Sequence, residues 1–329
     1  MKRLAVLAFI AGIGVITVLV FSRGAGAVWH ALTAIGWSGF AIVCLFHLAL
    51  IGLMGISWLV LVPETRGARA LTLIWARLVR DSGAEILPFS QLGGFVMGAR
   101  AAAVSGVPSL VAAASTVVDV TVELFAQIAF TAVGLAFLVA ARPDSGLAWP
   151  IGGALCVMLA ASIGFVIAQR RGLSIADRIA SHMLGDWVKT GLSLAGIESV
   201  IAAIYHRQGR AWLGGALHFL CWIASGVEAW IALRLMGAEI GLGPVIAIES
   251  LLYAARSVAF AVPSAVGVQE GAYLVIGGLF GLAPETVLAL SLLKRARDLT
   301  LGVPALLAWQ ALEARRAMAR APASGSAVP

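Results

Sequence analysis

The fold is decided by the stretch from Glu249 to Glu313, ESLLYAARSVAFAVPSAVGVQEGAYLVIGGLFGLAPETVLALSLLKRARDLTLGVPALLAWQALE. Its second half, from Pro284 to Glu313, predicts a helix long enough to span a bilayer. Near its middle this helix carries four charged residues: Lys294, Arg295, Arg297 and Asp298. At the centre of a span each such charge costs about 2.5–3.5 kcal/mol, whereas each Leu gains only about 0.5 kcal/mol. The four side chains must therefore face protein, water or a polar ligand instead of lipid.

The first half of the same stretch is an apolar run broken by proline and glycine. Pro263 and the glycines at 267, 271, 277 and 278 interrupt it, and it also holds Arg256, Gln269 and Glu270. An interrupted helix at membrane depth is tolerated only where it lines a cavity or is buried in protein. We therefore expect a functional site at this break, with Pro263, Gly267 and Gly271 as its hinge.

The composition identifies an integral membrane protein. Hydrophobic residues make up 61% of the 329 residues and charged residues 12%, against about 25% charged residues in a soluble domain. The formal charge of +7 predicts no nucleic-acid binding, because the arginines lie in short loops between apolar segments, where they set topology and contact anionic lipid. Three cysteines in apolar segments, without CxxC spacing, predict neither disulfides nor a metal site. We expect no cofactor.

Apolar runs of spanning length predict six full membrane spans, at about 4–21, 38–62, 108–141, 147–168, 211–236 and 285–312. The first of these resembles a signal peptide, but its length favours a retained helix. Two further runs, 70–106 and 244–281, are broken by proline and glycine. Arginines in the loop 63–83 (Arg66, Arg69, Arg77, Arg80), in the segment 169–210 and in the tail place these parts and both termini in the cytoplasm by the positive-inside rule.

This topology makes each broken run begin and end on one side of the membrane. We therefore expect two re-entrant helical hairpins that enter from opposite faces, within an inverted repeat of span, hairpin and span. The first would turn at Pro88, followed by Gly93 and Gly94, and the second at Pro263. The alternative is two kinked helix pairs unrelated by symmetry. The fold class is thus an all-α polytopic membrane protein with six spans and two broken-helix hairpins.

Four regions follow from this organisation. Residues 1–168 form an N-terminal membrane half, and residues 211–313 form a C-terminal half with the charged motif. Residues 169–210 join the halves as a cytoplasmic linker, with amphipathic helices around Ser174–Met183 and Ala195–Tyr205. Residues 314–329 are basic and then small, which predicts a disordered tail.

The candidate site groups acids and bases from both halves. Glu270 stands just past the proline break, where it is either a ligand-binding group or a helix cap, and Arg256 could pair with it or bind phosphate. Asp298 follows Lys294 by four residues and Arg295 by three, a helical spacing for ion pairs. It cannot neutralise three cations alone, so the surplus charge must meet other acids or a ligand. The candidate acids are Glu270, Glu228, Glu249, Asp119 and Glu123. Asp119 and Glu123 lie one turn apart on the first-half helix and supply acid there. A purely structural ion network remains the alternative. Gln269 completes the expected headgroup site.

The run Arg256, Pro263, Gly267–Tyr273, Leu290–Ser291, Lys294–Leu299, Pro304, Trp309–Gln310 and Glu313 resembles the flippase-like membrane family typified by the transmembrane region of lysylphosphatidylglycerol synthases. Within it the hopanoid-associated branch is the most similar. The resemblance implies movement of lipid between leaflets or toward the outer envelope in a bacterial inner membrane. Membrane lipids, either hopanoid or anionic phospholipid, and lipid-synthesis or envelope-transport proteins are the implied partners. The parent synthases also carry a cytoplasmic aminoacyl-transferring domain. The sequence of 329 residues shows no such domain, so we expect no transferase activity from the resemblance.

Two other functions stay open. An intramembrane lipid-modifying enzyme, or the membrane partner of one, could use Glu270 and Asp298 as acid–base groups. A structural scaffold would use the charges for packing alone. The sequence has no P-loop, HExxH or GxSxG motif, so we do not predict an enzyme with a known soluble chemistry.

Overall fold

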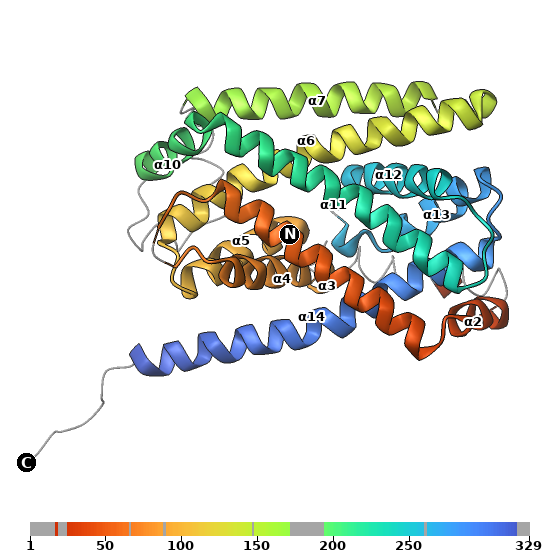
Figure 1. Ribbon diagram of the computed structural model, residues 1–329, viewed down its shortest axis with the longest axis horizontal. Helices are drawn as coiled ribbons and strands as arrows, with labels where there is room; N and C mark the ends of the chain where they lie inside the picture. Colours follow the sequence, from red (N-terminus) through yellow and green to blue (C-terminus); the bar gives the residue numbers. More distant parts are fainter. Residues whose placement is uncertain are drawn as a thin grey trace, which may run out of the picture.

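The computed structural model describes residues 17–18, 25–65, 67–87, 90–146, 148–171, 194–259 and 262–320. All regular structure in these residues is helical (Figure 1). In chain order the helices are α2 (Ala25–Ala34), α3 (Gly36–Leu61), α4 (Ala70–Ile86), α5 (Ser90–Val104), α6 (Ser109–Ala141), η1 (Pro143–Ser145), α7 (Ala148–Arg171), α10 (Leu194–His206), α11 (Gln208–Leu235), α12 (Leu242–Val258), η2 (Pro263–Ala265), α13 (Val268–Leu279) and α14 (Pro284–Arg320).

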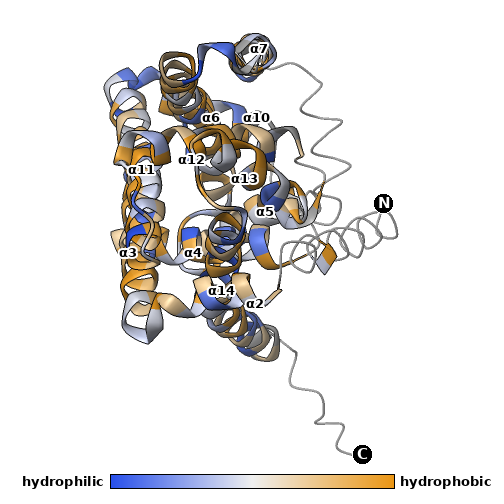
Figure 2. Cartoon of the chain, turned by 90° about the vertical axis from the view of Figure 1, so that its right-hand side faces the viewer, coloured by the Kyte–Doolittle hydropathy of each residue, from blue (hydrophilic) through white to orange (hydrophobic). Residues whose placement is uncertain are grey.

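Four helices of the described residues are long and apolar enough to cross a membrane: α3, α6, α7 and α11. They correspond to four of the six predicted spans. The predicted span at 4–21 lies outside the described residues. Helix α14 has 37 residues but is not among the four, because of its charges. In Figure 2 apolar colour dominates α3, whereas hydrophilic colour interrupts α4 and α14.

Both predicted broken segments are pairs of short helices. The arms have 17 and 15 residues in α4 and α5, and 17 and 12 residues in α12 and α13. At about 1.5 Å per residue, none of the arms reaches the roughly 30 Å of a hydrocarbon core. In Figure 1 the two pairs approach the middle of the molecule from opposite ends. Each pair is therefore a hairpin that enters the bundle and turns back inside it.

The two hairpins break for different local reasons. Helix α4 stops at Leu87, whose φ of −89° and ψ of 145° are extended, as expected of a residue before proline; residues 88–89 lie outside the described part of the chain. In the second hairpin, Ser264, Ala265 and Gly267 have left-handed φ angles of 53°, 46° and 84°. Left-handed backbone is unfavourable for Ser and Ala, so the surrounding packing must hold this turn in place.

The order of long helix, hairpin and long helix occurs twice, as predicted, and the two copies pack reciprocally. Helices α3 and α11, which begin the copies, pack against each other. Helix α4 of the first hairpin packs on α14, the long helix after the second hairpin, and α12 of the second hairpin packs on α6, the long helix after the first. The hairpin tips also touch, through contacts of α4 and α5 with η2. This reciprocal arrangement brings the two halves together at the hairpin tips.

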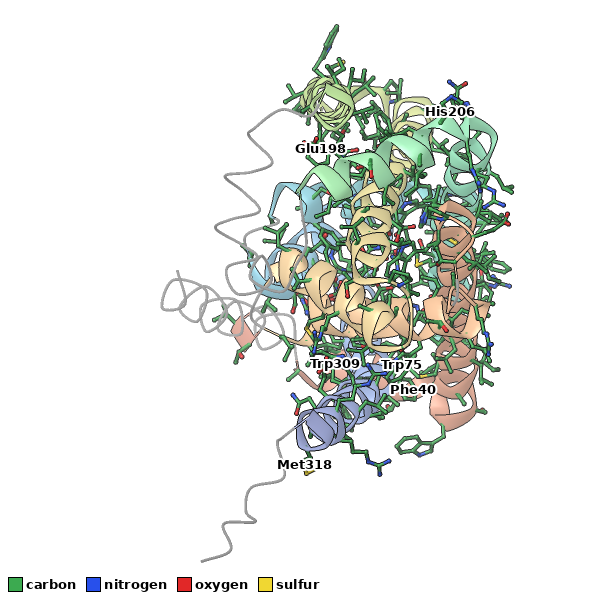
Figure 3. The ribbon with its side chains drawn as sticks, turned by 90° about the vertical axis from the view of Figure 1, so that its left-hand side faces the viewer. Phe40, Trp75, Glu198, His206, Trp309 and Met318 are labelled. Atoms are coloured by element: carbon green, nitrogen blue, oxygen red, sulfur yellow. The ribbon has the colours of Figure 1, made fainter. Side chains whose placement is uncertain are left out.

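Helix α14 ends later than we expected, and the structure describes only residues 169–171 and 194–210 of the predicted linker. Helix α14 continues through Arg320, beyond the expected end at Glu313, because Glu313 pairs with Arg100 of α5 at 2.7 Å and the following residues favour helix. Residues 321–329 and the predicted helix at Ser174–Met183 lie outside the described residues. The stretch around Ala195–Tyr205 is α10, which packs on α6 and α7. Figure 3 shows α10 with Glu198 and His206 at one end of the bundle.

The buried apolar residues form separate clusters, some of which draw on both halves. One apolar cluster joins α11, α12, α13 and α14, and another joins α3, α4, α5 and α6. Trp309 of α14 packs against the second cluster beside Trp75 of α4 (Figure 3). Helix α14 thus serves as part of the wall of the first hairpin as well as of its own half.

Candidate functional site

Each basic residue in the middle of α14 has an acidic partner on another helix. Lys294 Nζ lies 2.5 Å from the carboxylate of Glu249 on α12. Arg295 donates to Glu270 on α13 at 2.8 Å. The expected surplus of positive charge is therefore balanced inside the protein by acids from neighbouring helices.

The third cation, Arg297, has two acidic partners. It donates to Glu228 on α11 and to its neighbour Asp298 at 2.7 Å. Asp298 was considered as the local counter-ion of Lys294 and Arg295, at helical spacings of four and three residues. In the structure it pairs with Arg297 instead, because Lys294 and Arg295 reach acids on α12 and α13.

Glu270 is a helix cap and an ion-pair partner at once. Its carboxylate accepts from the backbone N–H of Gly267 at 2.8 Å, from Ser291 at 2.8 Å and from Arg295. It is fully buried, so it has no face toward a pocket. The capping alternative considered for Glu270 is present in the structure, together with a structural ion pair.

Arg256 and Ser264 connect the second hairpin to Glu85 of the first. Arg256 donates to the side-chain amide oxygen of Gln269 at 2.8 Å and to the Glu85 carboxylate of α4 at 2.5 Å. Gln269 in turn donates to Ser291 of α14 at 2.8 Å. The Ser264 hydroxyl donates to the backbone carbonyl of Glu85. In the described part of the hairpins, the tips are therefore held together by one ion pair and one hydrogen bond.

Two small pockets border this junction. The first is lined by Glu85, Gln91, Arg256 and Ser264 together with apolar residues of both tips. Glu85 also lines the second, between α3, α4 and α14. The Arg256 side chain is 11% exposed and that of Glu85 27%, so this pair faces open space.

The second pocket is acidic. Its polar lining residues are His47, Asp81, Ser82, Glu85 and Asp298. The side chains of Asp81 and Asp298 are 28% and 19% exposed. Glu85 thus lies between an acidic pocket on one side and the guanidinium of Arg256 on the other.

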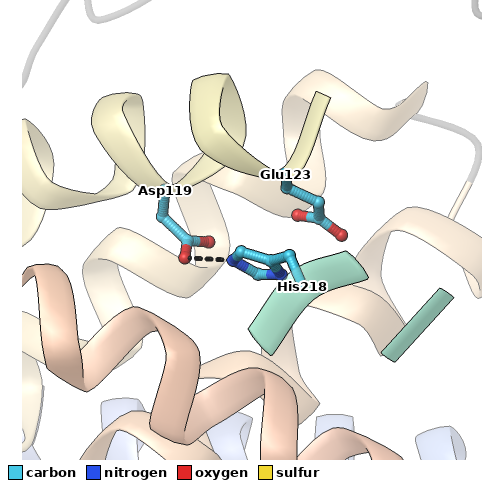
Figure 4. A group of neighbouring side chains, drawn as sticks. All are labelled: Asp119, Glu123 and His218. Carbon is cyan, nitrogen blue, oxygen red and sulfur yellow. Dashed lines mark hydrogen bonds and ion pairs between the residues drawn. The ribbon is translucent and has the colours of Figure 1, made fainter. Parts of the chain in front are cut away.

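A second ion network lies in the first half, around Asp119 and Glu123 of α6 (Figure 4). Arg77 of α4 makes two hydrogen bonds to Glu123, at 2.7 and 3.0 Å. Arg80, one turn further along α4, bonds Asp119 and Glu123 at 2.6 Å each. His218 of α11 bonds Asp119 at 2.9 Å through Nε2. Both acids that we expected in the site are therefore fully engaged by basic groups.

This network also corrects the location that we predicted for Arg77 and Arg80. Arg77 and Arg80 were assigned to a cytoplasmic loop at 63–83, but both lie inside α4 with only 3% of their surface exposed. Their charges balance buried acids and do not mark a side of the membrane. The orientation expected from the positive-inside rule now depends on Arg66 and Arg69 before α4 and on the arginines of 169–210 and of the tail.

Asp119, Glu123 and His218 offer ligand atoms within 4.8 Å of one another, a spacing that could suit a metal ion. However, the two guanidinium groups of Arg77 and Arg80 occupy the carboxylate oxygens. A cation between these carboxylates would have to displace both arginines and leave them buried and unpaired, which is costly. We therefore assign the cluster to ion pairing.

The expected hinge residues occupy different environments. Gly267 and Pro263 lie in the broken turn of the second hairpin, whereas Gly93, Gly94 and Gly271 lie within α5 and α13, and Pro88 lies outside the described residues. At Gly94 a Cβ atom would lie 2.6 Å from the Arg80 carbonyl oxygen, so the lack of a side chain lets α5 approach α4 closely.

Several residues of the networks were not singled out from the sequence. They are His47, Asp81, Glu85 and His218, and Arg77 and Arg80 were interpreted as loop residues. Glu228 and Glu249 were considered only as possible counter-ions. A charged residue within an apolar run was the available signal for all of them, but their pairing depends on which helices meet.

The comparison with known families agrees with the membrane architecture. No match was found among curated proteins or among solved structures. Residues 5–306 match the family described as the lysylphosphatidylglycerol synthase TM region. The match covers the first repeat and the second repeat as far as residue 306, within α14. The chain therefore belongs to the lysylphosphatidylglycerol synthase TM region family of membrane proteins.

Proposed function

We propose that the protein moves a lipid with a polar, phosphate-bearing headgroup between the two leaflets of a membrane, without changing the lipid chemically. The observation that carries the proposal is the meeting of two hairpins of short helices, from opposite ends of the bundle, at the partly exposed Arg256–Glu85 pair. Such a junction of broken helices is typical of transporters, in which the binding site lies near mid-membrane and is opened to each side in turn.

The charge at this junction suits an anionic headgroup. A phosphate that leaves water loses its hydration and needs strong donors in exchange, and arginine supplies several donors in a planar fork that matches phosphate. Arg256 lines the pocket, together with the Gln91 amide and the Ser264 hydroxyl. Lys294 and Arg297 are less exposed, at 8% and 7% of their side chains, and they line neither pocket. Arg256 is therefore the cation we assign to the headgroup.

Binding requires an exchange of partners at Arg256. In the present geometry Glu85 occupies the guanidinium from the opposite hairpin. A phosphate that takes its place releases Glu85 toward the second pocket and breaks the ion pair between the tips. Occupation of the site would thus loosen the contact between the hairpins, which couples binding to movement.

The cargo and location follow the same argument. A neutral hopanoid skeleton offers nothing for the guanidinium, so we assign an anionic phospholipid or another phosphorylated lipid in preference to a hopanoid. The bacterial inner membrane, with both termini in the cytoplasm, remains the location we propose, supported by the arginines of 169–210 and of the tail.

Reconstitution tests the proposal. Liposomes containing the purified protein and a fluorescent phospholipid would be treated with a membrane-impermeant quencher, so that the loss of protected signal reports translocation. The double variant Glu85→Gln with Arg256→Gln removes both charges of the pair and so leaves no unpaired charge behind. We expect it to fold and to lose about 90% or more of the translocation rate, the equivalent of at least about 1.4 kcal/mol in the barrier.

Arg100→Gln is the matched control, because Arg100 pairs with Glu313 at the far end of α5; it should translocate at the wild-type rate. A double variant that translocates as fast as wild type would remove the junction from the site. A lipid recovered in chemically modified form would indicate the enzyme alternative instead.

A further inference from the structure

Two of the ion clusters contain one carboxylate more than they contain cations. On α4 and α6, Asp81, Asp119 and Glu123 face Arg77 and Arg80. This cluster therefore carries one negative charge more than its cations balance, beside an interior where an isolated charge is costly; its Asp81 side chain is 28% exposed.

The same surplus occurs in the other half. There Glu228 of α11 and Asp298 of α14 share the single cation Arg297. By contrast, Lys294–Glu249, Arg295–Glu270 and Arg256–Glu85 pair one to one.

Both clusters with surplus acid contain a histidine on the shared carboxylate. His218 Nε2 lies 2.9 Å from Asp119, and His47 Nδ1 lies 3.0 Å from Glu228. His47 is on α3 and His218 is on α11, the first helices of the two repeats, at nearly the same distance from the start of each helix. The neutral pairs of the interior have no histidine among their partners.

The second ring nitrogen of His218 has a distinct environment. His218 is fully buried, and its Nδ1 atom has no hydrogen-bond partner in the described part of the chain. A neutral ring that donates from Nε2 to Asp119 leaves the Nδ1 lone pair free to accept a proton. One proton on each histidine would bring the charge of each cluster to zero.

We propose that His47–Glu228 and His218–Asp119 are two proton-binding sites, each formed by a histidine of one repeat and an acid of the other, and that their loading couples lipid translocation to proton movement. The coupling to lipid translocation rests on the proposed function, whereas the proton-binding sites do not. The other groups around the His47–Glu228 pair are Arg297, Lys294, Asp298, Asp81, Glu85 and the Cys44 thiol. Those around His218 are Glu123, Arg77, Arg80 and the Cys221 thiol.

The two sites differ in access. The His47 side chain is 23% exposed and lines the acidic pocket, whereas His218 is sealed. In an inverted repeat, equivalent positions exchange environments when the protein switches between its two states. A proton that enters at one site while the other is closed, and leaves after the switch, would move with each cycle.

Nitrogen NMR of the histidine rings tests the sites without reference to lipid. Protein labelled with ¹⁵N-histidine in bilayers would be titrated between about pH 5 and 8, where histidine ordinarily changes charge. Signals are assigned with His47→Gln and His218→Gln, and His30→Gln, exposed on α2, is the control. We expect both interior rings to change from neutral to imidazolium within this range.

Asp119→Asn gives the sharper result, because it removes the surplus carboxylate of its cluster while Glu123 and Asp81 still balance both arginines. In this variant we expect the His218 ring to stay neutral over the same range, while His47 still titrates. Interior rings that stay neutral throughout the titration in the wild type would overturn the proton sites, as would an unchanged His218 titration in Asp119→Asn.

Coupling is measured in the same bilayers with an imposed pH gradient. We expect the gradient to change the wild-type translocation rate by about fivefold or more and to have no effect in His218→Gln or His47→Gln. An equal rate with and without the gradient in the wild type would overturn the coupling. If the rings titrate but the protein moves no lipid, the proton sites are supported and the proposed function is refuted. If the protein moves lipid but the rings do not titrate, the proposed function is supported and the proton sites are refuted.

Discussion

The pair Lys294–Glu249 gives the sharpest test of whether the charges of α14 serve the fold or the cargo. Glu249 is fully buried and Lys294 nearly so. The carboxylate accepts from Lys294 at 2.5 Å and from the Tyr273 hydroxyl at 2.6 Å. Neither residue lines a pocket. The geometry therefore assigns this pair to the fold.

Removing one partner should be much worse than removing both charges. Lys294→Met leaves the Glu249 carboxylate buried with a single neutral donor, and Glu249→Gln leaves the ammonium unpaired. Each change should lower the free energy of unfolding by about 3–5 kcal/mol. The double variant retains an acceptor for Tyr273 and leaves only one amide nitrogen unpaired, so we expect a loss of about 1–3 kcal/mol.

The free energy of unfolding would be measured by equilibrium denaturation in mixed detergent micelles, for the wild type, both single variants and the double variant. A double variant less stable than either single variant would refute the assignment to an ion pair. The translocation rate of the same variants in liposomes gives a second measurement. We expect the double variant to translocate as the wild type does, and a stable double variant that moves no lipid would place Lys294 in the headgroup site after all.

Three further predictions follow from the packing. Gly94→Ala should lower the free energy of unfolding by about 1–3 kcal/mol, because its Cβ atom would press on the Arg80 backbone. Gly271→Ala, whose Cβ atom meets nothing within 4 Å, should raise it by up to about 1 kcal/mol in thermal or chemical denaturation. Equal effects of the two variants would contradict the packing. Glu270→Gln should lower the free energy of unfolding by about 1–3 kcal/mol, because it weakens the pair with Arg295 and the cap, and an unchanged midpoint in denaturation would count against both roles. Cysteines placed at Glu64 and Glu239, in a variant without the native cysteines, should react with impermeant reagents from opposite sides of the membrane, and labelling from one side would refute the inverted repeat.

The broken hairpins could be predicted from sequence because their signals are local. A proline fixes its own backbone and restricts the residue before it, and Leu87 has the extended conformation that this predicts. Glycine at 267 supplies a left-handed turn. Neither signal depends on any other helix, so the position of each break follows from a few residues.

Charge pairing could not be predicted in the same way, because it depends on which helices meet. On α14 the spacing of Lys294 and Asp298 fits an i, i+4 pair. However, the Lys294 side chain reaches Glu249 on α12, and Asp298 bonds Arg297. Likewise Arg77 in isolation resembles a loop arginine, and only its ion pairs with Asp119 and Glu123 of α6 show that it belongs to the interior.

The pairing also limits how the protein can move. In the first half the hairpin helix α4 supplies the cations and α6 the acids, whereas in the second half α12 supplies the acid and α14 the cations. Separating either hairpin helix from its long helix would leave buried charges unpaired, at about 3–5 kcal/mol for each broken pair. Each hairpin is therefore held to the long helix of its own half.

Across the halves, the described contacts of the tips are the ion pair of Arg256 with Glu85, whose partners are both partly exposed, and the hydrogen bond from Ser264 to the Glu85 carbonyl. A headgroup or water can replace either partner there at lower cost than in the sealed clusters. The tip of the two hairpins is thus the place in the described structure where the halves can part, which is where a moving lipid headgroup needs them to part.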